Sequence, residues 1–273
     1  MNINLNILIK KFVIFVSLVY TNSIYASDSY DFNLYNNYGI VGTIHTPSAR
    51  TFEEGVHGLT LYKGTPNQTV TLSANPFNWL EASFFYTNVT DRPYCYEPGD
   101  VVCQQDFKDK GFNIKARLKE QGVFPAVAIG LNDLAGTGIY SSEYIVGSYG
   151  INRTDFHFGI GFGLLNGSDL RFKNPLGYLS DRFYERSTVT KDIGGSFDAA
   201  KYFTGETASP FFGVSHALGN KLLLKAEYDS SVRPGLVPFR IPENDFSFGI
   251  DYLITDNFSI GVSYERGDYA SFK

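Results

Sequence analysis

Apolar and polar side chains alternate with a period of two along most of the chain after residue 55. Between Leu80 and Tyr86, for example, apolar residues occupy the even positions, and Glu81 and Ser83 lie between them. The same alternation recurs at 112–119, 156–164, 222–229, 246–254 and 258–264. A period of two is that of a pleated strand, and helical periodicity is nearly absent. The pattern therefore predicts an all-β fold.

Eleven strands are predicted, and a twelfth would begin at residue 268. The eleven are expected at 56–63, 68–75, 79–88, 110–119, 123–131, 142–150, 154–164, 208–217, 220–229, 244–254 and 257–265. The twelfth is the weakest, because Tyr269–Lys273 make only half a span. Strands of roughly 9 to 11 residues can cross a bilayer when tilted, and soluble β-sandwiches use strands of similar length. Strand length alone leaves both architectures open.

The connections between these strands favour a barrel. Tight turns are predicted at 76–78, 120–122, 151–153, 218–219 and 255–256. Longer links fall between them, at 89–109, 132–141, 165–207 and 230–243, so that short and long links alternate strictly. Outer-membrane barrels have tight turns at one end and long loops at the other, whereas a Greek-key sandwich has no reason to sort its loops in this way.

The two faces of the strands agree with a barrel whose apolar face is covered by lipid and whose polar face lines a lumen. The lumen-facing candidates are charged residues and one histidine, namely Glu81, Lys115, Arg117, Lys119, His157, Lys225, Glu227, Asp251 and Glu265. The alternative is a soluble β-sandwich with this polar face in water. The expected fold is an antiparallel up-and-down transmembrane β-barrel of about 12 strands, spanning 56–273.

The first residues resemble a secretory signal peptide. Lys10 and Lys11 precede the apolar run Phe12–Tyr20, and the polar segment after it ends at Ala26. A membrane-spanning helix needs roughly 20 apolar residues, so a run this short is expected to target the chain and to be removed after Ala26. An uncleaved short anchor is the alternative. Residues 27–55 then form an extension that either plugs the lumen or pairs with a strand edge.

Composition and cysteine spacing narrow the classes of protein. The chain is 43% apolar and 19% charged with a net charge of -5, which fits neither a disordered protein nor a basic nucleic-acid binder. Cys95 and Cys103 are the only cysteines. Export into an oxidising compartment favours a disulfide between them, because a zinc site would need two further ligands nearby.

Sequence patterns that carry chemistry are nearly absent. The chain has no HExxH, P-loop, GxSxG or CxxC motif, and its four histidines have no ligand spacing, so we expect no metal, no cofactor and no enzymatic activity. Asp133 and Glu143 bracket the turn 136–138 and could form an acid/base pair for sugar chemistry. Carboxylates beside a glycine turn more often cap backbone amides or pair with Lys and Arg, and we favour that interpretation.

Several segments together resemble the YjbH-type exopolysaccharide and capsule proteins of Gram-negative bacteria. They are 38–42, 46–50, 79–87, 106–115, 124–138, 142–146 and 158–163, and 124–138 is the longest and most specific. The motif positions are Pro47, Arg50, Trp79, Glu81, Pro125, Asp133, Gly136, Thr137, Gly138, Ser142, Glu143 and Tyr144.

The resemblance implies an outer-membrane β-barrel that assists export or assembly of an extracellular polysaccharide, without known catalytic residues. It also implies that the chain corresponds to the amino-terminal barrel of longer relatives, many of which look like lipoproteins, although no cysteine lies at the expected cleavage site here. Outer-membrane lipid is the expected partner, with polysaccharide and periplasmic export proteins as further candidates. A small general porin or structural barrel and a secreted soluble glycan-binding β-domain are the alternative functions.

Overall fold

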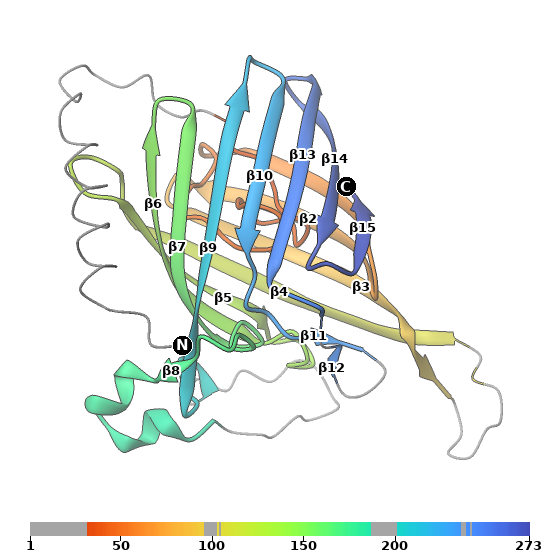
Figure 1. Ribbon diagram of the computed structural model, residues 1–273, viewed down its shortest axis with the longest axis vertical. Coiled ribbons are helices and arrows are strands. Elements are labelled where there is room, and N and C mark those ends of the chain that lie inside the picture. Colours follow the sequence, from red (N-terminus) through yellow and green to blue (C-terminus); the bar gives the residue numbers. More distant parts are fainter. Residues whose placement is uncertain (1–31, 96–102, 104, 187–200, 236–238, 241) are drawn as a thin grey trace, which may run out of the picture.

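The computed structural model describes residues 32–95, 103, 105–186, 201–235, 239–240 and 242–273. The predicted signal peptide at 1–26 lies outside the described residues. Twelve strands form a closed antiparallel barrel, and the two-residue strand β8 is added beside β9 (Figure 1). The barrel strands are β1 (His57–Lys63), β2 (Asn67–Phe77), β3 (Leu80–Tyr94), β4 (Gln105–Lys119), β5 (Ala126–Leu134), β6 (Ser142–Ile151), β7 (Thr154–Gly163), β9 (Thr207–Leu218), β10 (Leu222–Tyr228), β13 (Phe246–Thr255), β14 (Phe258–Glu265) and β15 (Tyr269–Phe272).

Each strand pairs with its neighbour in the chain, so the barrel has the predicted up-and-down order. The ring closes where β15 meets β1, and this seam consists of the single pair Lys63 and Phe272. The expected twelfth strand is therefore present as a short strand of four residues.

Exposed and buried side chains alternate along the strands, as expected for one closed sheet around an interior. Phe158 and Phe248 are 57% and 58% exposed on the outer face, whereas two stacked sheets would have buried them. The inner positions between such residues are buried, as Ser247 and Asp251 are on β13. Along such strands, period-two alternation thus places the apolar side chains outside and the polar side chains inside.

Turns and loops are sorted to opposite ends of the barrel, with one difference from the prediction. Short turns join β6 to β7, β9 to β10 and β13 to β14 at the upper end of Figure 1. The longer connections lie at the lower end, but the links 64–66 and 266–268 at that end are also short. The predicted strict alternation of short and long links is therefore wrong at the first and last hairpins.

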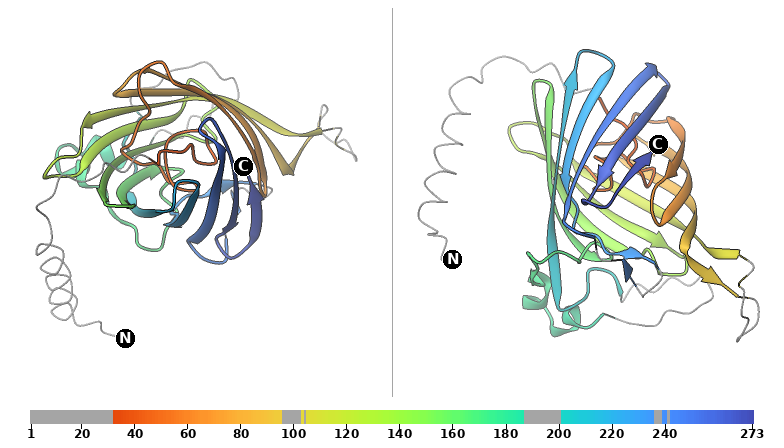
Figure 2. Two further views of the ribbon diagram at one scale, coloured as in Figure 1. Left: turned by 90° about the horizontal axis from the view of Figure 1, so that it is seen from above. Right: turned by 45° about the vertical axis from the view of Figure 1, so that its right-hand side comes forward.

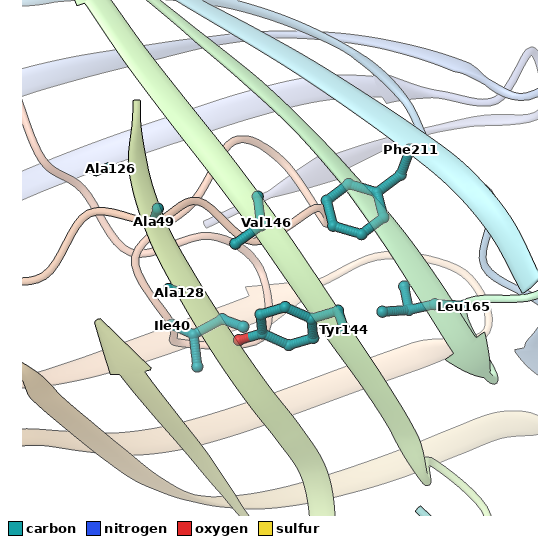
Figure 3. Close-up of a cluster of buried hydrophobic side chains, with 8 residues drawn as sticks. All are labelled: Ile40, Ala49, Ala126, Ala128, Tyr144, Val146, Leu165 and Phe211. Atoms are coloured by element: carbon teal, nitrogen blue, oxygen red, sulfur yellow. The ribbon is translucent and has the colours of Figure 1, made fainter. Parts of the chain in front are cut away.

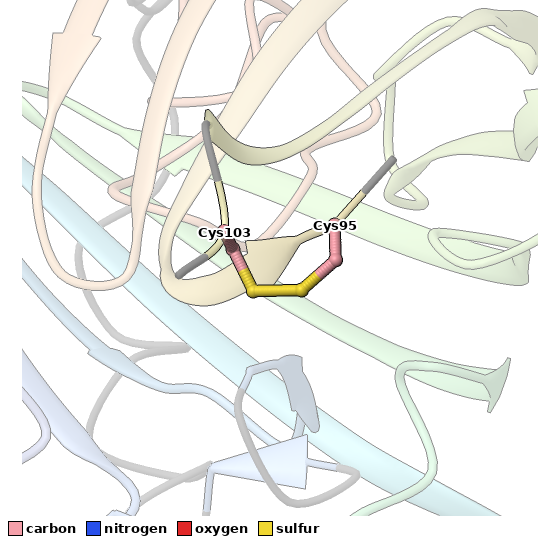
Figure 4. Close-up of a disulfide and its surroundings, with 2 residues drawn as sticks. All are labelled: Cys95 and Cys103. Atoms are coloured by element: carbon pink, nitrogen blue, oxygen red, sulfur yellow. A yellow bond between two sulfur atoms is a disulfide. The ribbon is translucent and has the colours of Figure 1, made fainter. Parts of the chain in front are cut away.

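The hairpin of β3 and β4 extends much further than the pattern predicted. Strand pairing continues through Tyr94 and Gln105, so most of the expected loop 89–109 is strand. A disulfide between Cys95 and Cys103 joins the two arms near the tip (Figure 4), which confirms the predicted bridge.

The two longest loops contain small elements that the sequence pattern did not predict. Between β7 and β9 lie β8 (Phe172–Lys173) and the 3-10 helices η2 (Pro175–Tyr178) and η3 (Asp181–Tyr184). Between β10 and β13, β11 (Arg233–Pro234) pairs with β12 (Phe239–Arg240). In the part of the chain that the structure describes, no helix is long and apolar enough to cross a membrane.

The glycine run 159–163 lies within β7, as predicted. A Cβ atom on Gly159 would come within 2.2 Å of the ring of Phe211 on β9 and within 2.7 Å of the carbonyl oxygen of Ile145. A larger side chain would therefore displace the neighbouring strand or its phenyl ring. Close packing on the inner face explains the glycine at this position.

Candidate functional site

Most of the segment 32–55 lies inside the barrel, and we call this segment the plug; its last residues, 53–55, are exposed. Seen along the barrel in Figure 2 (left), the segment coils within the ring of strands. Its central residues are almost fully buried, with Val41 at 2% and His45 at 3% exposure. Two isolated bridges, Tyr35 to Val41 and Gly42 to Pro47, fold the segment back on itself. Of the two roles that the sequence left open for this extension, it takes that of filling the lumen.

Glu227 on β10 binds three consecutive backbone amides of the plug. Its carboxylate accepts hydrogen bonds from the backbone N–H groups of Ile44, His45 and Thr46 at 2.9–3.0 Å. The hydroxyl of Thr46 donates a further bond at 2.9 Å. Because both oxygens accept from the plug, one buried carboxylate fixes the path of its backbone.

An ion pair on the opposite wall binds a single plug residue through both of its backbone groups. Glu81 on β3 accepts a hydrogen bond from the N–H of Val41 at 2.9 Å, and Lys115 on β4 donates to the carbonyl of the same residue at 2.9 Å. The two side chains also pair with each other at 3.2 Å. Both are buried, so neither charge faces the lumen without a partner.

A second lysine holds the plug from β10. Lys225 donates to the carbonyl of Thr43 at 2.8 Å and pairs with Asp251 on β13 at 2.5 Å. Lys273 also pairs with Asp251, at 3.1 Å, and donates to the carbonyl of Tyr35. Cations on the wall thus bind plug carbonyls just as carboxylates bind plug amides.

Glu265 on β14 is the centre of a buried polar network. It accepts hydrogen bonds from the side chains of His45 and Asn37 in the plug, at 2.7 and 2.9 Å, and pairs with Arg233 at 2.9 Å. Arg233 also approaches Asp229, at 3.4 Å. Burial favours a raised pKa for Asp229, but Arg266, Arg233 and His45 together lower its pKa to about 2.

The last part of the plug binds β6 and β7. Arg50 donates two hydrogen bonds to Asp155, both at 2.8 Å, and a third to Gln121 in the turn between β4 and β5. The backbone N–H of Ala49 donates to Ser148 at 2.8 Å. The bidentate geometry with a buried carboxylate fixes the guanidinium in one orientation.

An apolar cluster completes the contact between plug and wall (Figure 3). Ile40 and Ala49 come from the plug, and Tyr144 and Val146 come from β6. The other members are Ala126, Ala128, Leu165 and Phe211. Close-packed side chains and polar groups surround the plug, and a cavity between the plug and the wall, lined among others by Tyr38, His45 and Phe85, measures about 30 Å³, enough for a few water molecules at most.

The predicted lumen residues lie mostly where the alternation placed them. Glu81, Lys115, His157, Lys225, Glu227, Asp251 and Glu265 are buried inside the barrel. His157 contacts Ser148 at 2.8 Å. Arg117 lies at the short-turn end, where it donates to the carbonyl of Asn78 and pairs with Glu120.

Lys119 does not face the lumen, and that prediction is wrong. A register shift between Arg117 and Lys119 pairs Lys119 with Val127, which points outward because its neighbours Ala126 and Ala128 are buried. The ammonium group of Lys119 lies outside, 4.7 Å from the ring centroid of Phe124. A β-bulge, which sequence alternation does not reveal, moves the side chain to the other face.

Other residues of the site were missed from the sequence. Asp155 lies two positions before His157 on the same face of β7, so the alternation could have identified it. Arg233 and Arg266 lie outside the long strands and carry no periodic signal. They reach the interior because the loop after β10 and the turn after β14 fold inward at the long-loop end.

The carboxylates of the glycine-turn motif bind backbone and arginine. Asp133, at a φ of 56°, accepts a hydrogen bond from the N–H of Tyr140 at 3.0 Å. Glu143 forms a bidentate pair with Arg186, both bonds at 2.8 Å, and accepts from the N–H of Phe203 at 2.9 Å. Both residues thus shape the loops at one end of the barrel.

Most of the remaining motif positions lie either beside the glycine turn or at the opposite, short-turn end of the barrel. Thr137 donates to Asp109 at 2.8 Å, and Ser142 accepts from Asn132 at 3.0 Å. Gly138 has a φ of 88°, in the left-handed region that favours glycine, and Gly136 packs directly against the carboxylate of Asp133. At the short-turn end, Pro125 precedes β5, and Trp79 stacks on Phe77 with 5.6 Å between ring centroids. Pro47 forms the plug bridge with Gly42.

Comparison with known proteins agrees with the sequence resemblance. The family YjbH, described as "Exopolysaccharide biosynthesis protein YbjH", matches residues 34–273. The chain is 35% identical over 240 residues to the "Uncharacterized lipoprotein YjbH" of Escherichia coli (strain K12). This alignment covers 87% of the chain and 34% of the relative, so the chain spans about a third of the relative's length. No solved structure matches the chain significantly. The chain belongs to the YjbH exopolysaccharide biosynthesis family.

Proposed function

We propose that this protein is a non-enzymatic barrel of the bacterial outer membrane, closed by its own plug, that assists export or assembly of an extracellular polysaccharide. The observation that carries the proposal is the division of the side chains between the two faces of one closed sheet. Apolar groups cover the outside, and the buried charges inside are engaged by the plug.

The outer face favours a lipid environment. Aromatic side chains lie exposed near both ends of the barrel, with Phe77, Trp79 and Phe258 at the short-turn end and Phe246 and Tyr264 at the long-loop end. The band between them carries exposed aliphatic residues, including Leu59, Leu61, Leu72 and Val262, and exposed aromatic residues, such as Phe112, Phe158 and Phe248. An apolar outer band with aromatic residues at both of its borders is typical of outer-membrane barrels. Exposed apolar area of this extent would promote aggregation in water.

The plug separates this proposal from that of a general porin. Open porins have water-filled channels, whereas here buried wall residues bind the plug from β3, β4, β7, β10 and β14. The role in polysaccharide export rests on membership of the family. A non-enzymatic role is supported by the bonds that Asp133 and Glu143 already make to backbone and arginine.

Deletion of the gene tests the role in the cell. We expect less polysaccharide at the cell surface, with recovery when the wild-type gene is supplied in trans. Unchanged surface polymer would contradict the role in export, whatever the location of the protein.

Gel mobility of membrane extracts tests the location independently. A closed barrel resists unfolding by detergent until it is boiled, so the protein is expected in the outer-membrane fraction with a heat-dependent shift in mobility. Recovery in the periplasm or medium without detergent would instead favour a soluble glycan-binding domain. Steady conductance of the wild-type protein in planar bilayers would favour a porin.

A further inference from the structure

The outer face of β1 to β4 changes from apolar to polar side chains within two rows. The strand registers place four apolar residues side by side in one row, Leu59, Leu72, Phe84 and Phe112. The next outward row toward the long loops holds Leu61, Val70, Tyr86 and Lys110, and the one after it holds Lys63, Gln68, Asn88 and Lys108. Beyond this level the β3–β4 hairpin leaves the wall (Figure 1). The apolar band thus ends here at three lysines, Lys63, Lys108 and Lys110, which we call the lysine border.

The charges of the lysine border are available to a ligand. All three lysines are exposed, and none pairs with a carboxylate among the described residues. Lys108 donates to the side chain of Gln105 at 2.6 Å. The carboxylate two residues before it, Asp106, accepts a hydrogen bond from Asn88 at 2.9 Å. Successive outward residues of one strand lie roughly 7 Å apart, and three strand spacings, as between Lys63 and Lys108, span roughly 14 Å. The ammonium groups therefore surround one patch of the outer face.

The long-loop end of the opposite wall carries aromatic side chains instead. Phe212, Tyr228 and Phe246 lie side by side on β9, β10 and β13. Their ring centroids are 6.1 and 5.4 Å apart. Tyr264 of β14 is exposed at the same end. Aromatic residues at the border of an apolar band anchor a barrel in any bilayer, whereas lysines gathered on one side favour lipids with negative charge.

We propose that the lysine border binds a phosphorylated lipid of the outer leaflet. Its phosphate groups lie on Lys63, Lys108 and Lys110, and its acyl chains cover the exposed side chains of the rows below, including Leu61, Val70 and Phe112. This inference rests on the outer-membrane location proposed above, in which the long loops face outward.

The arrangement matches an amphiphile better than a soluble polyanion. Ammonium groups stand directly above an apolar surface, so they meet the negative charges of a lipid whose acyl chains run along that surface. Gln68 and Tyr86 lie between the lysines in the two polar rows and add neutral donors for phosphate oxygens. An acidic polysaccharide would also meet the lysines, but it has no acyl chains to cover the apolar rows.

Native mass spectrometry of the full-length protein in detergent measures the affinity for a defined lipid. The probe is lipid A with two phosphate groups, and it is compared with its dephosphorylated form and with its deacylated, water-soluble form. Each sample is first checked for the heat-dependent gel shift. We expect both altered forms to bind at least about tenfold more weakly than intact lipid A, because one lacks the charge and the other the acyl chains. Raising NaCl from about 0.05 to about 0.5 M is expected to weaken binding of the intact lipid.

A triple variant tests the lysines directly. Lys63→Gln, Lys108→Gln and Lys110→Gln together are expected to weaken binding of intact lipid A at least about tenfold. The control is Lys119→Gln with Lys221→Gln, which removes exposed lysines at the short-turn end and should change the affinity less than about twofold.

Three results would overturn the proposal. They are unchanged affinity of the triple variant, equal weakening in the control, and binding of the deacylated form as tightly as the intact lipid, which would favour a soluble acidic polymer as the ligand. A wild-type protein that shows the gel shift but does not bind lipid A contradicts this inference alone. Absence of the shift would contradict the membrane barrel as well.

Discussion

Glu227 is the side chain on which the position of the plug depends most directly. Its buried carboxylate accepts from the backbone N–H groups of Ile44, His45 and Thr46, all donors that would otherwise lack a partner inside the barrel. An amide in place of the carboxylate would remove the charge and direct an NH₂ group toward other donors. Hydrogen bonds to charged groups are stronger than neutral ones, so this position is sensitive to a small chemical change.

The substitution Glu227→Gln is expected to lower the free energy of unfolding of the refolded protein by about 2–3 kcal/mol and to increase proteolytic cleavage within the plug. Denaturant titration and limited proteolysis measure the two effects. Glu120→Gln is the matched control, because Glu120 is exposed, and it should change stability by less than about 0.5 kcal/mol. Equal effects of the two substitutions would contradict the role given to Glu227.

The lowered pKa of Asp229 leads to a prediction of how the free energy of unfolding depends on pH. Its pKa falls from the ordinary 3.8 to about 2, so the ionised form stabilises the folded protein above about pH 4, and this contribution is lost as the pH falls through 2. The stability difference between wild type and Asp229→Asn is expected to be about 2 kcal/mol at pH 6 and near zero below pH 2. Denaturant titrations at several pH values measure it, with Asp256→Asn in an exposed turn as the control. A difference independent of pH would exclude this ion pairing.

The strands show which parts of the fold the sequence can predict. The sequence pattern predicted eleven of the barrel strands and, more weakly, the twelfth, because most of them have one apolar and one polar face. It failed at the tip of the β3–β4 hairpin, where residues such as Asp91, Arg92 and Pro93 carry no alternating pattern. It also failed at Lys119, because a bulge changes the face without changing the sequence pattern.

From the pairing of the β3–β4 hairpin we expect the disulfide to stabilise only the tip of this hairpin. Below the register shift at Val89 the two strands pair continuously from Leu80, so the barrel wall does not depend on the bridge. Replacing Cys95 and Cys103 together by serine is expected to speed amide exchange at Asp106 and Phe107 by about tenfold, and to leave the heat-dependent gel shift unchanged. Faster exchange throughout the barrel would show that the bridge stabilises the whole fold.

The molecule as a whole is a barrel filled by its own amino-terminal residues, and this arrangement could be predicted only in part. The inner charges were predicted from the alternation, but their plug partners lie in a segment without periodicity. The contacts join residues far apart in the chain, as Asn37 and Glu265 do, and sequence spacing carries no signal for such pairs.

Removal of residues 32–55 is expected to convert a closed barrel into a conducting one. Water can then solvate Glu81, Glu227 and Glu265, so a polar lumen tolerates the loss of the plug better than an apolar core would. We expect stepwise currents in planar bilayers from the deletion variant and none from the wild type. A deletion variant that keeps the heat-dependent gel shift but passes no current would show that the wall side chains close the lumen by themselves.

The contacts of the plug also constrain the order in which the protein assembles. Ile44 and Glu227 are 183 positions apart, and Asn37 and Glu265 are 228 positions apart. The plug can therefore form these hydrogen bonds only after β10 and β14 have been added to the barrel. The plug thus reaches its final position only after these distant strands are in place, and folding dominated by such distant contacts is slow.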